Sequence, residues 1–301
     1  MPEDDMATTL DGLSWQDIAP SFLRYANLAY GKSPLIHHLW RKLQLSTEQT
    51  VSLLEPMTNI AITGPENSGK SVLNDALQVR IREHSYKLPE PSTDAERDLI
   101  TIGKWSKVVT VIPGQEVRQK DVWQKKAFSE NGRLAGVVFV ANWGYMYPRS
   151  KAVREKFLKE APELQRLRTK MLSAEADEFR KICVEIRKFH QVSKRPVWFI
   201  VAVSKADLYY DRLSDAESYY SLDAKPSSKT LSNGTRSFYS IYRDEIAQRV
   251  GSDNIRATSL PVSSFVENFE WGDEVARGSI SDADRRALLN HFIATMNIMS
   301  A

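Results

Sequence analysis

Eight consecutive residues have the types and the spacing of a phosphate-binding loop. They run Gly64-Pro65-Glu66-Asn67-Ser68-Gly69-Lys70-Ser71, followed by Val72. The two glycines let the backbone wrap, so that its N–H groups can point at phosphate oxygens. In such a loop the lysine reaches the β- and γ-phosphates, and the following hydroxyl binds Mg²⁺. The pattern predicts a nucleoside triphosphate site formed by residues 64–72.

The residues on either side of this loop support the prediction. Residues 59–63 are an apolar run of strand length, and residues 71–84 have the periodicity of a helix. A strand, a loop and a helix in this order place the loop at a helix N-terminus, where backbone N–H groups lack partners. The alternative is a glycine-rich turn that binds no ligand.

Two further polar motifs follow predicted strands. The apolar run at residues 196–203 ends in Ser204-Lys205-Ala206-Asp207, and the run at residues 108–112 ends in Pro113-Gly114-Gln115-Glu116. Taken with the phosphate loop, the order of motifs resembles that of a small, Ras-like or Arf-like GTPase of the translation-factor-related class. The alternatives are an ordinary capping or turn cluster at the first motif and a simple Pro-Gly turn at the second.

The resemblance implies how a guanine base would be recognised. Asp207 would accept hydrogen bonds from the guanine N1–H and amino group, and the stem of Lys205 would stack on the ring. Adenine has no matching donors, so the carboxylate would lose its partners. Ser204 stands where the family has Asn or Thr, and its hydroxyl would tie this loop to the phosphate loop.

The resemblance also assigns the catalytic and metal-binding positions. Gly114 would sense the γ-phosphate, and Gln115 would orient the attacking water. Val111 stands where the family has an aspartate that holds Mg²⁺ through water, so the metal would depend on Ser71, the phosphates and a switch threonine. Thr93 lies 23 residues after Lys70, as expected of that threonine, and Ser92 is the alternative.

Two further positions complete the predicted site. A fifth motif, which contacts the guanine O6 in the family, is matched by Ser263 and Ser264, with Thr258-Ser259 as the alternative alignment. Glu66 occupies a phosphate-loop position where rapidly hydrolysing relatives have glycine. Its side chain would crowd the approach to the γ-phosphate, which predicts slow intrinsic turnover.

The pattern along the chain predicts the fold. Residues 1–57 are expected to form a helical extension, and residues 58–301 a three-layer α/β P-loop NTPase domain with a mostly parallel sheet. Apolar runs and helical patterns alternate. The runs are at 59–63, 99–105, 108–112, 134–141, 196–203 and 255–262, and the helices at 71–84, 153–190, 238–250 and 282–299. Insertions relative to the family fall near 145–195, 213–236 and 265–281, and 213–236 is predicted to be a surface loop.

Composition narrows the possible classes. Of 301 residues, 42% are hydrophobic and 26% charged, and the single cysteine, Cys183, excludes an internal disulfide. The absence of a signal sequence, apolar span or lipidation motif predicts a cytoplasmic protein without a membrane anchor. A net charge of +3 gives no argument for nucleic acid. The basic stretch at 151–195 is interpreted as the solvated side of an amphipathic helix whose apolar side includes Val153, Phe179 and Ile186.

The sequence thus predicts a guanine-nucleotide switch that binds GTP or GDP with Mg²⁺ and hydrolyses GTP slowly. Segments 88–100 and 115–128 would act as switches and bind an effector protein, and an activating protein is a possible second partner. A pseudo-GTPase scaffold without turnover is one alternative, motivated by Val111 and Glu66. A P-loop ATPase or kinase is the other.

Overall fold

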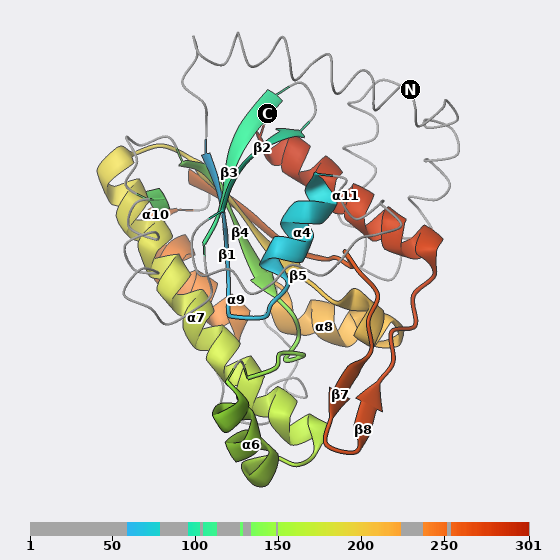
Figure 1. Ribbon diagram of the computed structural model, residues 1–301. Helices are drawn as coiled ribbons and strands as arrows, with labels where there is room; N and C mark the ends of the chain where they lie inside the picture. Colours follow the sequence, from blue (N-terminus) through green and yellow to red (C-terminus); the bar gives the residue numbers. More distant parts are fainter. Residues whose placement is uncertain are drawn as a thin grey trace.

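The fold is described from a computed structural model (Figure 1). It describes residues 59–78, 96–102, 105–112, 127–128, 134–148, 150–223, 237–251 and 254–300. The predicted helical extension, residues 1–57, and most of the two predicted switch segments lie outside these ranges.

A six-stranded sheet forms the centre of the molecule, in the order β2-β3-β1-β4-β5-β6. The strands are β1 (Asn59–Thr63), β2 (Glu96–Ile102), β3 (Trp105–Val111), β4 (Leu134–Ala141), β5 (Val197–Val203) and β6 (Ile255–Pro261). Every neighbouring pair is parallel except β2 and β3. The mostly parallel sheet is therefore confirmed. The predicted strand at 99–105 is wrong in its bounds. β2 covers residues 96–102, and residue 105 already belongs to β3, which pairs with β2 in the antiparallel direction.

Helices cover both faces of this sheet (Figure 1). One face carries α4 (Lys70–Leu77) and α11 (Asp282–Ser300), and the other carries α7 (Leu164–Ser193), α9 (Phe238–Tyr242) and α10 (Gln248–Val250). Apolar strands buried on both faces require such cover. On the second of these faces, the ring of Phe179 in α7 packs against the sheet and against α9. Its centre lies 5.3 Å from that of Phe139 in β4 and 4.2 Å from that of Phe238 in α9. The three-layer α/β architecture is confirmed.

The predicted helix at 153–190 is two helices. α6 (Lys151–Glu160) ends before Pro162, and α7 begins at Leu164, since proline cannot continue a helix through its own N–H. α6 has no buried residue, and Val153, predicted to lie on the apolar side, is 42% exposed. α7 buries its apolar side as predicted, including Phe179, Cys183 and Ile186. No helix within the described ranges has the length and apolar composition needed to cross a membrane.

The prediction of a surface loop at 213–236 is wrong for its first part. Residues 213–220 form helix α8 (Leu213–Tyr220), which follows the 3₁₀ helix η2 (Ala206–Arg212). Leu213, Ala216 and Tyr220 are buried at helical spacing, so the polar residues between them are the solvated side of a helix. Residues 224–236 lie outside the described ranges.

The chain on either side of β6 contains a helix with a π-helical segment and a short β-hairpin. α9 continues through the π-helical segment η4 (Arg243–Ala247) into α10, which matches the predicted helix at 238–250. Residues 265–281, predicted as an insertion, contain the hairpin of β7 (Phe269–Trp271) and β8 (Glu274–Ala276). α11 then begins as predicted, because the Ser281 hydroxyl accepts a hydrogen bond from the Asp284 N–H at 3.1 Å.

Phe179→Ala is expected to destabilise the fold by about 3–5 kcal/mol, because it removes the ring that joins α7 to β4, β5 and α9. Urea unfolding followed by circular dichroism measures the change. Val192→Ala on the same helix is the control, since Val192 is 88% exposed and its loss should change stability by less than about 0.5 kcal/mol. Equal midpoints for both variants would contradict the packing described here.

Candidate nucleotide-binding site

The phosphate-loop residues lie at the carboxyl edge of the sheet, at the lower edge in Figure 1. β1 leads into them between β3 and β4, and the chain continues to β2 and β3 on one side and to β4 on the other. Such a switch point in an open parallel sheet leaves a crevice at the strand ends. Lys70 begins α4, and Ser71 and Val72 follow in its first turn, half-buried.

The two loop glycines are required by the backbone. A Cβ on Gly64 would lie 2.3 Å from the backbone oxygen of Val140, so this position cannot hold a larger residue without moving β4. Gly69, at φ 94°, is in the left-handed region immediately before α4. Asn67 also has a positive φ, of 57°. The loop therefore wraps tightly around the end of β1.

The Lys70 side chain lies across the inside of this loop. Its ammonium donates to the carbonyl oxygens of Gly64 at 3.1 Å and Pro65 at 2.5 Å, and the side chain is only 7% exposed. Ser68 is fully buried, and its hydroxyl has no hydrogen-bond partner among the residues described. An ammonium held against the backbone of a tightly wrapped loop fits an anion such as a polyphosphate.

Ser204 ties the loop after β5 to the phosphate loop. Its hydroxyl donates to the carbonyl of Ser68 at 2.5 Å, and its own N–H donates to the carbonyl of Ala141 at 2.7 Å. The tie between these loops is the one that the sequence predicted for a serine in this position. Ser204 is 5% exposed, so the bond is shielded from water.

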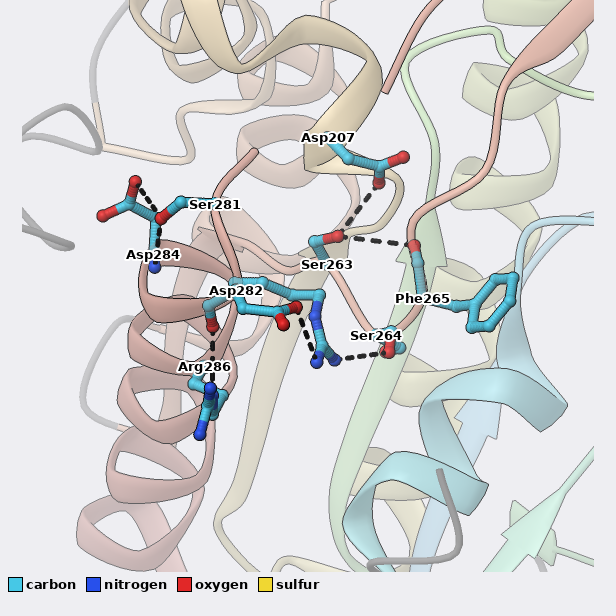
Figure 2. A network of polar contacts seen from close by, with 9 residues as sticks. Asp207, Ser263, Ser264, Phe265, Ser281, Asp282, Asp284 and Arg286 are labelled. Carbon is cyan, nitrogen blue, oxygen red and sulfur yellow. Dashed lines mark hydrogen bonds and ion pairs between the residues drawn. The ribbon is translucent and has the colours of Figure 1, made fainter. Parts of the chain in front are cut away.

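Asp207 lies in the turn beyond Ser204, next to the loop after β6 (Figure 2). Its carboxylate accepts from the Ser263 hydroxyl at 2.9 Å and from the Glu267 N–H at 3.3 Å. Burial raises the pKa of Asp207, although these hydrogen bonds lower it. Ser263 and Ser264 are both buried directly after β6, whereas the alternative pair, Thr258 and Ser259, lies within the strand.

Lys205 connects this turn to the loop after β4. Its backbone is left-handed, with φ 58°, and its ammonium donates to the carbonyl of Tyr145 at 2.8 Å. The ammonium also lies 5.5 Å from the centre of the Phe269 ring. Burial lowers the pKa of Lys205 to about 8, an effect that the charges of Glu267 and Asp207 oppose. Lys205 also lines the neighbouring pocket.

A pocket of about 520 Å³, including the open space at its mouth, connects the two groups of residues. It is lined by residues of the phosphate loop side, of the turn after β5 and of the loop after β6. They are Gly69, Val72, Tyr147, Ser204, Lys205, Asp207, Leu208, Ser264, Phe265, Glu267, Asn268 and Phe269. Figure 2 shows the Phe265 ring directed toward the N-terminal end of α4. The mixture of aromatic and polar side chains in its walls is typical of a small-molecule site.

The loop after β4, residues 142–147, also belongs to the candidate site, although it was not among the predicted site residues. Asn67 donates to the carbonyl of Tyr147 at 2.8 Å, and Asn142 donates to the carbonyl of Asn67 at 3.4 Å. With the bond from Lys205 to Tyr145, this loop joins the phosphate loop to the turn after β5. A polar Asn directly after a buried strand was the available signal, because strand ends in parallel sheets carry ligands.

Several predicted positions remain predictions. Gly114, Gln115 and Thr93 lie outside the described residues. Val111 is the last residue of β3 and is buried. Its hydrocarbon side chain has no atom that could bind a metal ion at this strand end. Glu66 is half-buried in the loop. In the described ranges no group of three or more His, Cys, Asp or Glu residues could hold a metal ion. Ser71, the other predicted metal ligand, lies in the first turn of α4.

The strand order, with a glycine-bounded loop between β1 and α4, is the fold of a P-loop NTPase. No family model matches this chain, and no curated protein matches its sequence. Among solved structures the chain is similar to one titled "The Structure of the Mammalian SRP Receptor", at 14% identity and a TM-score of 0.37. The match covers 68% of this chain and 91% of that one.

Ser204→Ala is expected to loosen the phosphate loop, because it removes the only side-chain hydrogen bond described between Ser204 and Ser68. Hydrogen exchange measured by mass spectrometry should be faster in residues 64–69, with a stability loss of about 1 kcal/mol. Ser264→Ala is the matched control, since the buried Ser264 hydroxyl has no partner in the described part of the chain. Unchanged exchange in Ser204→Ala would show that the loop is held by other contacts.

Proposed function

We propose that this protein is a guanine-nucleotide-binding switch of the P-loop class, which binds GTP and GDP with Mg²⁺. The observation that carries the proposal is the buried Asp207 carboxylate, which lines one pocket together with Gly69 at the start of α4. A nucleotide would bind with its phosphates in the phosphate loop and its base in this pocket. The domain extends over residues 58–301, with residues 1–57 as an extension.

The phosphate loop supports the polyphosphate half of the proposal. Lys70 carries its charge among backbone carbonyls that a phosphate would replace as partners. Ser71, in the first turn of α4, would ligate Mg²⁺, which neutralises phosphate charge when bound. Val111 contributes no oxygen, so the ion would depend on Ser71, on Thr93 and on retained water.

The pocket supports guanine over adenine. The Ser263 hydroxyl donates to one Asp207 oxygen and the Glu267 N–H to the other, and a carboxylate oxygen can accept two hydrogen bonds. Both oxygens can therefore also accept from the N1–H and amino group of guanine. Adenine has no donors at these positions and would leave the buried charge without partners. The stem of Lys205 and the backbone of Ser263 and Ser264 would complete the contacts to the base.

Turnover is proposed to be slow. Gln115 would orient water and Gly114 would sense the γ-phosphate, while the Glu66 side chain would crowd the approach to the γ-phosphate. Segments 88–100 and 115–128 would be ordered by the γ-phosphate and released after hydrolysis, and in the ordered state they would bind an effector protein. An activating protein would accelerate hydrolysis.

A scaffold that binds nucleotide without hydrolysing it is the second candidate. The observation that favours it is Val111, which leaves the end of β3 without the carboxylate that holds Mg²⁺ in the GTPases that the sequence resembles. Weaker metal binding would lower the rate of hydrolysis more than the affinity for nucleotide, because the metal stabilises charge that develops in the transition state.

Asp207→Asn is expected to weaken GDP binding by about 100-fold or more while leaving ADP binding nearly unchanged, because the amide cannot accept both guanine hydrogen bonds. Calorimetric titration of both nucleotides measures the change. Asp211→Asn, an exposed aspartate in the same 3₁₀ helix, is the matched control. If ADP competes with GDP equally in the unmodified protein, the site belongs to an ATPase or kinase and the guanine proposal is wrong.

Single-turnover hydrolysis of bound GTP is expected at about 10⁻⁴–10⁻³ s⁻¹, the range of unassisted Ras-type sites. Gln115→Ala should lower this rate by at least about tenfold, because it removes the group that positions water. Gln191→Ala, at an exposed position on α7, should leave it unchanged. An intact GTP pool after many hours, despite tight binding, favours the scaffold, and a rate above about 1 s⁻¹ contradicts slow turnover.

A further inference from the structure

The loop at residues 142–147, which joins the two halves of the site, has a conformation that is costly to hold. Trp143 and Gly144 are consecutive left-handed residues, with φ of 51° and 80°. The left-handed region is unfavourable for tryptophan. A Cβ on Gly144 would lie 2.8 Å from the backbone oxygen of Arg168 in α7, so the loop is also pressed against that helix. Other groups must therefore stabilise this conformation.

Glu175 and Tyr220 bind the two backbone N–H groups at the beginning of the loop. The carboxylate of Glu175 accepts from the N–H of Asn142 at 2.8 Å, and the Tyr220 hydroxyl accepts from the N–H of Trp143 at 2.9 Å. The Tyr220 hydroxyl in turn donates to Glu175. Glu175 and Tyr220 are both fully buried, on α7 and α8.

Arg168 holds the other side of the same turn. Its Nε donates to the carbonyl of Trp143 at 3.2 Å, and its guanidinium lies 4.3 Å from the Trp143 ring and 4.5 Å from the Tyr145 ring. Arg212 lies 4.9 Å from the Trp143 ring. Packing alone would not require a carboxyl group here, since an apolar side chain would fill the space without the cost of burying a charge.

We propose that Glu175 is a positioning residue of the nucleotide site. By fixing the N–H of Asn142, it sets the loop whose Asn142 side chain and Tyr147 carbonyl hold Asn67, and whose Tyr145 carbonyl holds Lys205. The inference rests on the proposed function, because it is through Asn67 and Lys205 that the loop would act on phosphates and base. Glu175 itself does not line the pocket.

The charge of Glu175 determines how well it can do this. The ionised carboxylate accepts both hydrogen bonds, whereas a protonated one has an O–H that competes with the two donors. Burial raises the pKa of Glu175 to about 7, although the bonds from Tyr220 and Asn142 and the charge of Arg168 lower it. These two hydrogen bonds lower the pKa because they favour the ionised form, so protonation below about pH 7 weakens them.

The groups that face Glu175 do not titrate in the same range. Burial raises the pKa of Tyr209, Tyr219 and Tyr220, so these phenols stay neutral. Burial lowers the pKa of the Arg168 guanidinium, but an arginine side chain stays protonated throughout this pH range. Lys205, with a pKa of about 8, would produce a separate change on the alkaline side.

The test compares GDP affinity of the full chain and its Glu175→Gln variant between pH 6 and 8. At pH 8 the variant should bind about tenfold more weakly, because a Gln amide cannot accept both hydrogen bonds. As the pH falls to 6 the unmodified protein should lose affinity and the two profiles should converge. Titration of the nucleotide and of Lys205 affects both proteins equally, so it cancels when the two pH profiles are subtracted. Glu185→Gln on the same helix, which pairs with Lys188 at the surface, is the control.

Equal affinities and parallel profiles would overturn the inference. Tyr220→Phe answers the same question if Glu175→Gln does not fold, since it keeps the ring and removes the hydroxyl that serves both Glu175 and Trp143. If the unmodified protein binds no nucleotide, the proposed function fails. Hydrogen exchange of residues 64–69 then still decides whether Glu175 orders the phosphate loop, because unchanged exchange in the variant would show that it does not.

Discussion

The hydrogen bond from Ser204 to the carbonyl of Ser68 holds together loops that are 136 residues apart in the sequence. It is possible because β1 and β5, on either side of β4, end at the same edge of a parallel sheet. The phosphate loop cannot shift away from β4 either, since Gly64 lies directly against the backbone of Val140. The geometry of the candidate site thus follows from the register of three buried strands, and the loops themselves add short, shielded bonds.

Most of the polar groups around this site are buried, which makes their arrangement specific. Lys70, Asp207 and Glu175 each have low exposure, and each is held by named hydrogen-bond partners. A buried charge that loses its partner costs several kcal/mol, so alternative loop conformations are strongly disfavoured. The same property makes the site sensitive to small changes. Burial moves the pKa of Lys205 to about 8 and that of Glu175 to about 7, so both groups change charge near neutral pH.

The region at 145–195 has a structural role beyond its exposed helix. α7 packs its apolar side on the sheet through Phe179 and carries Arg168 and Glu175 to the loop after β4. The hairpin of β7 and β8 is joined to the same region, because the Trp271 indole donates to the carbonyl of Ala161. Of these two segments, Tyr147 and residues 267–269 line the pocket, and α7 supports the loop that carries Tyr147.

Local patterns in the sequence were sufficient for the phosphate loop and for most strands. The two loop glycines and the Lys-Ser pair act through backbone conformation and side-chain type at adjacent positions, and the apolar run of β4 matches the strand residue by residue. The sequence also indicated Ser204, Asp207 and Ser263 by their places after strands. It did not indicate Glu175 or Tyr220, since their partners lie 33 and 77 residues away and their types are unremarkable in amphipathic helices. Only tertiary packing, which removes water from the end of β4, turned these two side chains into partners of the loop at residues 142–147.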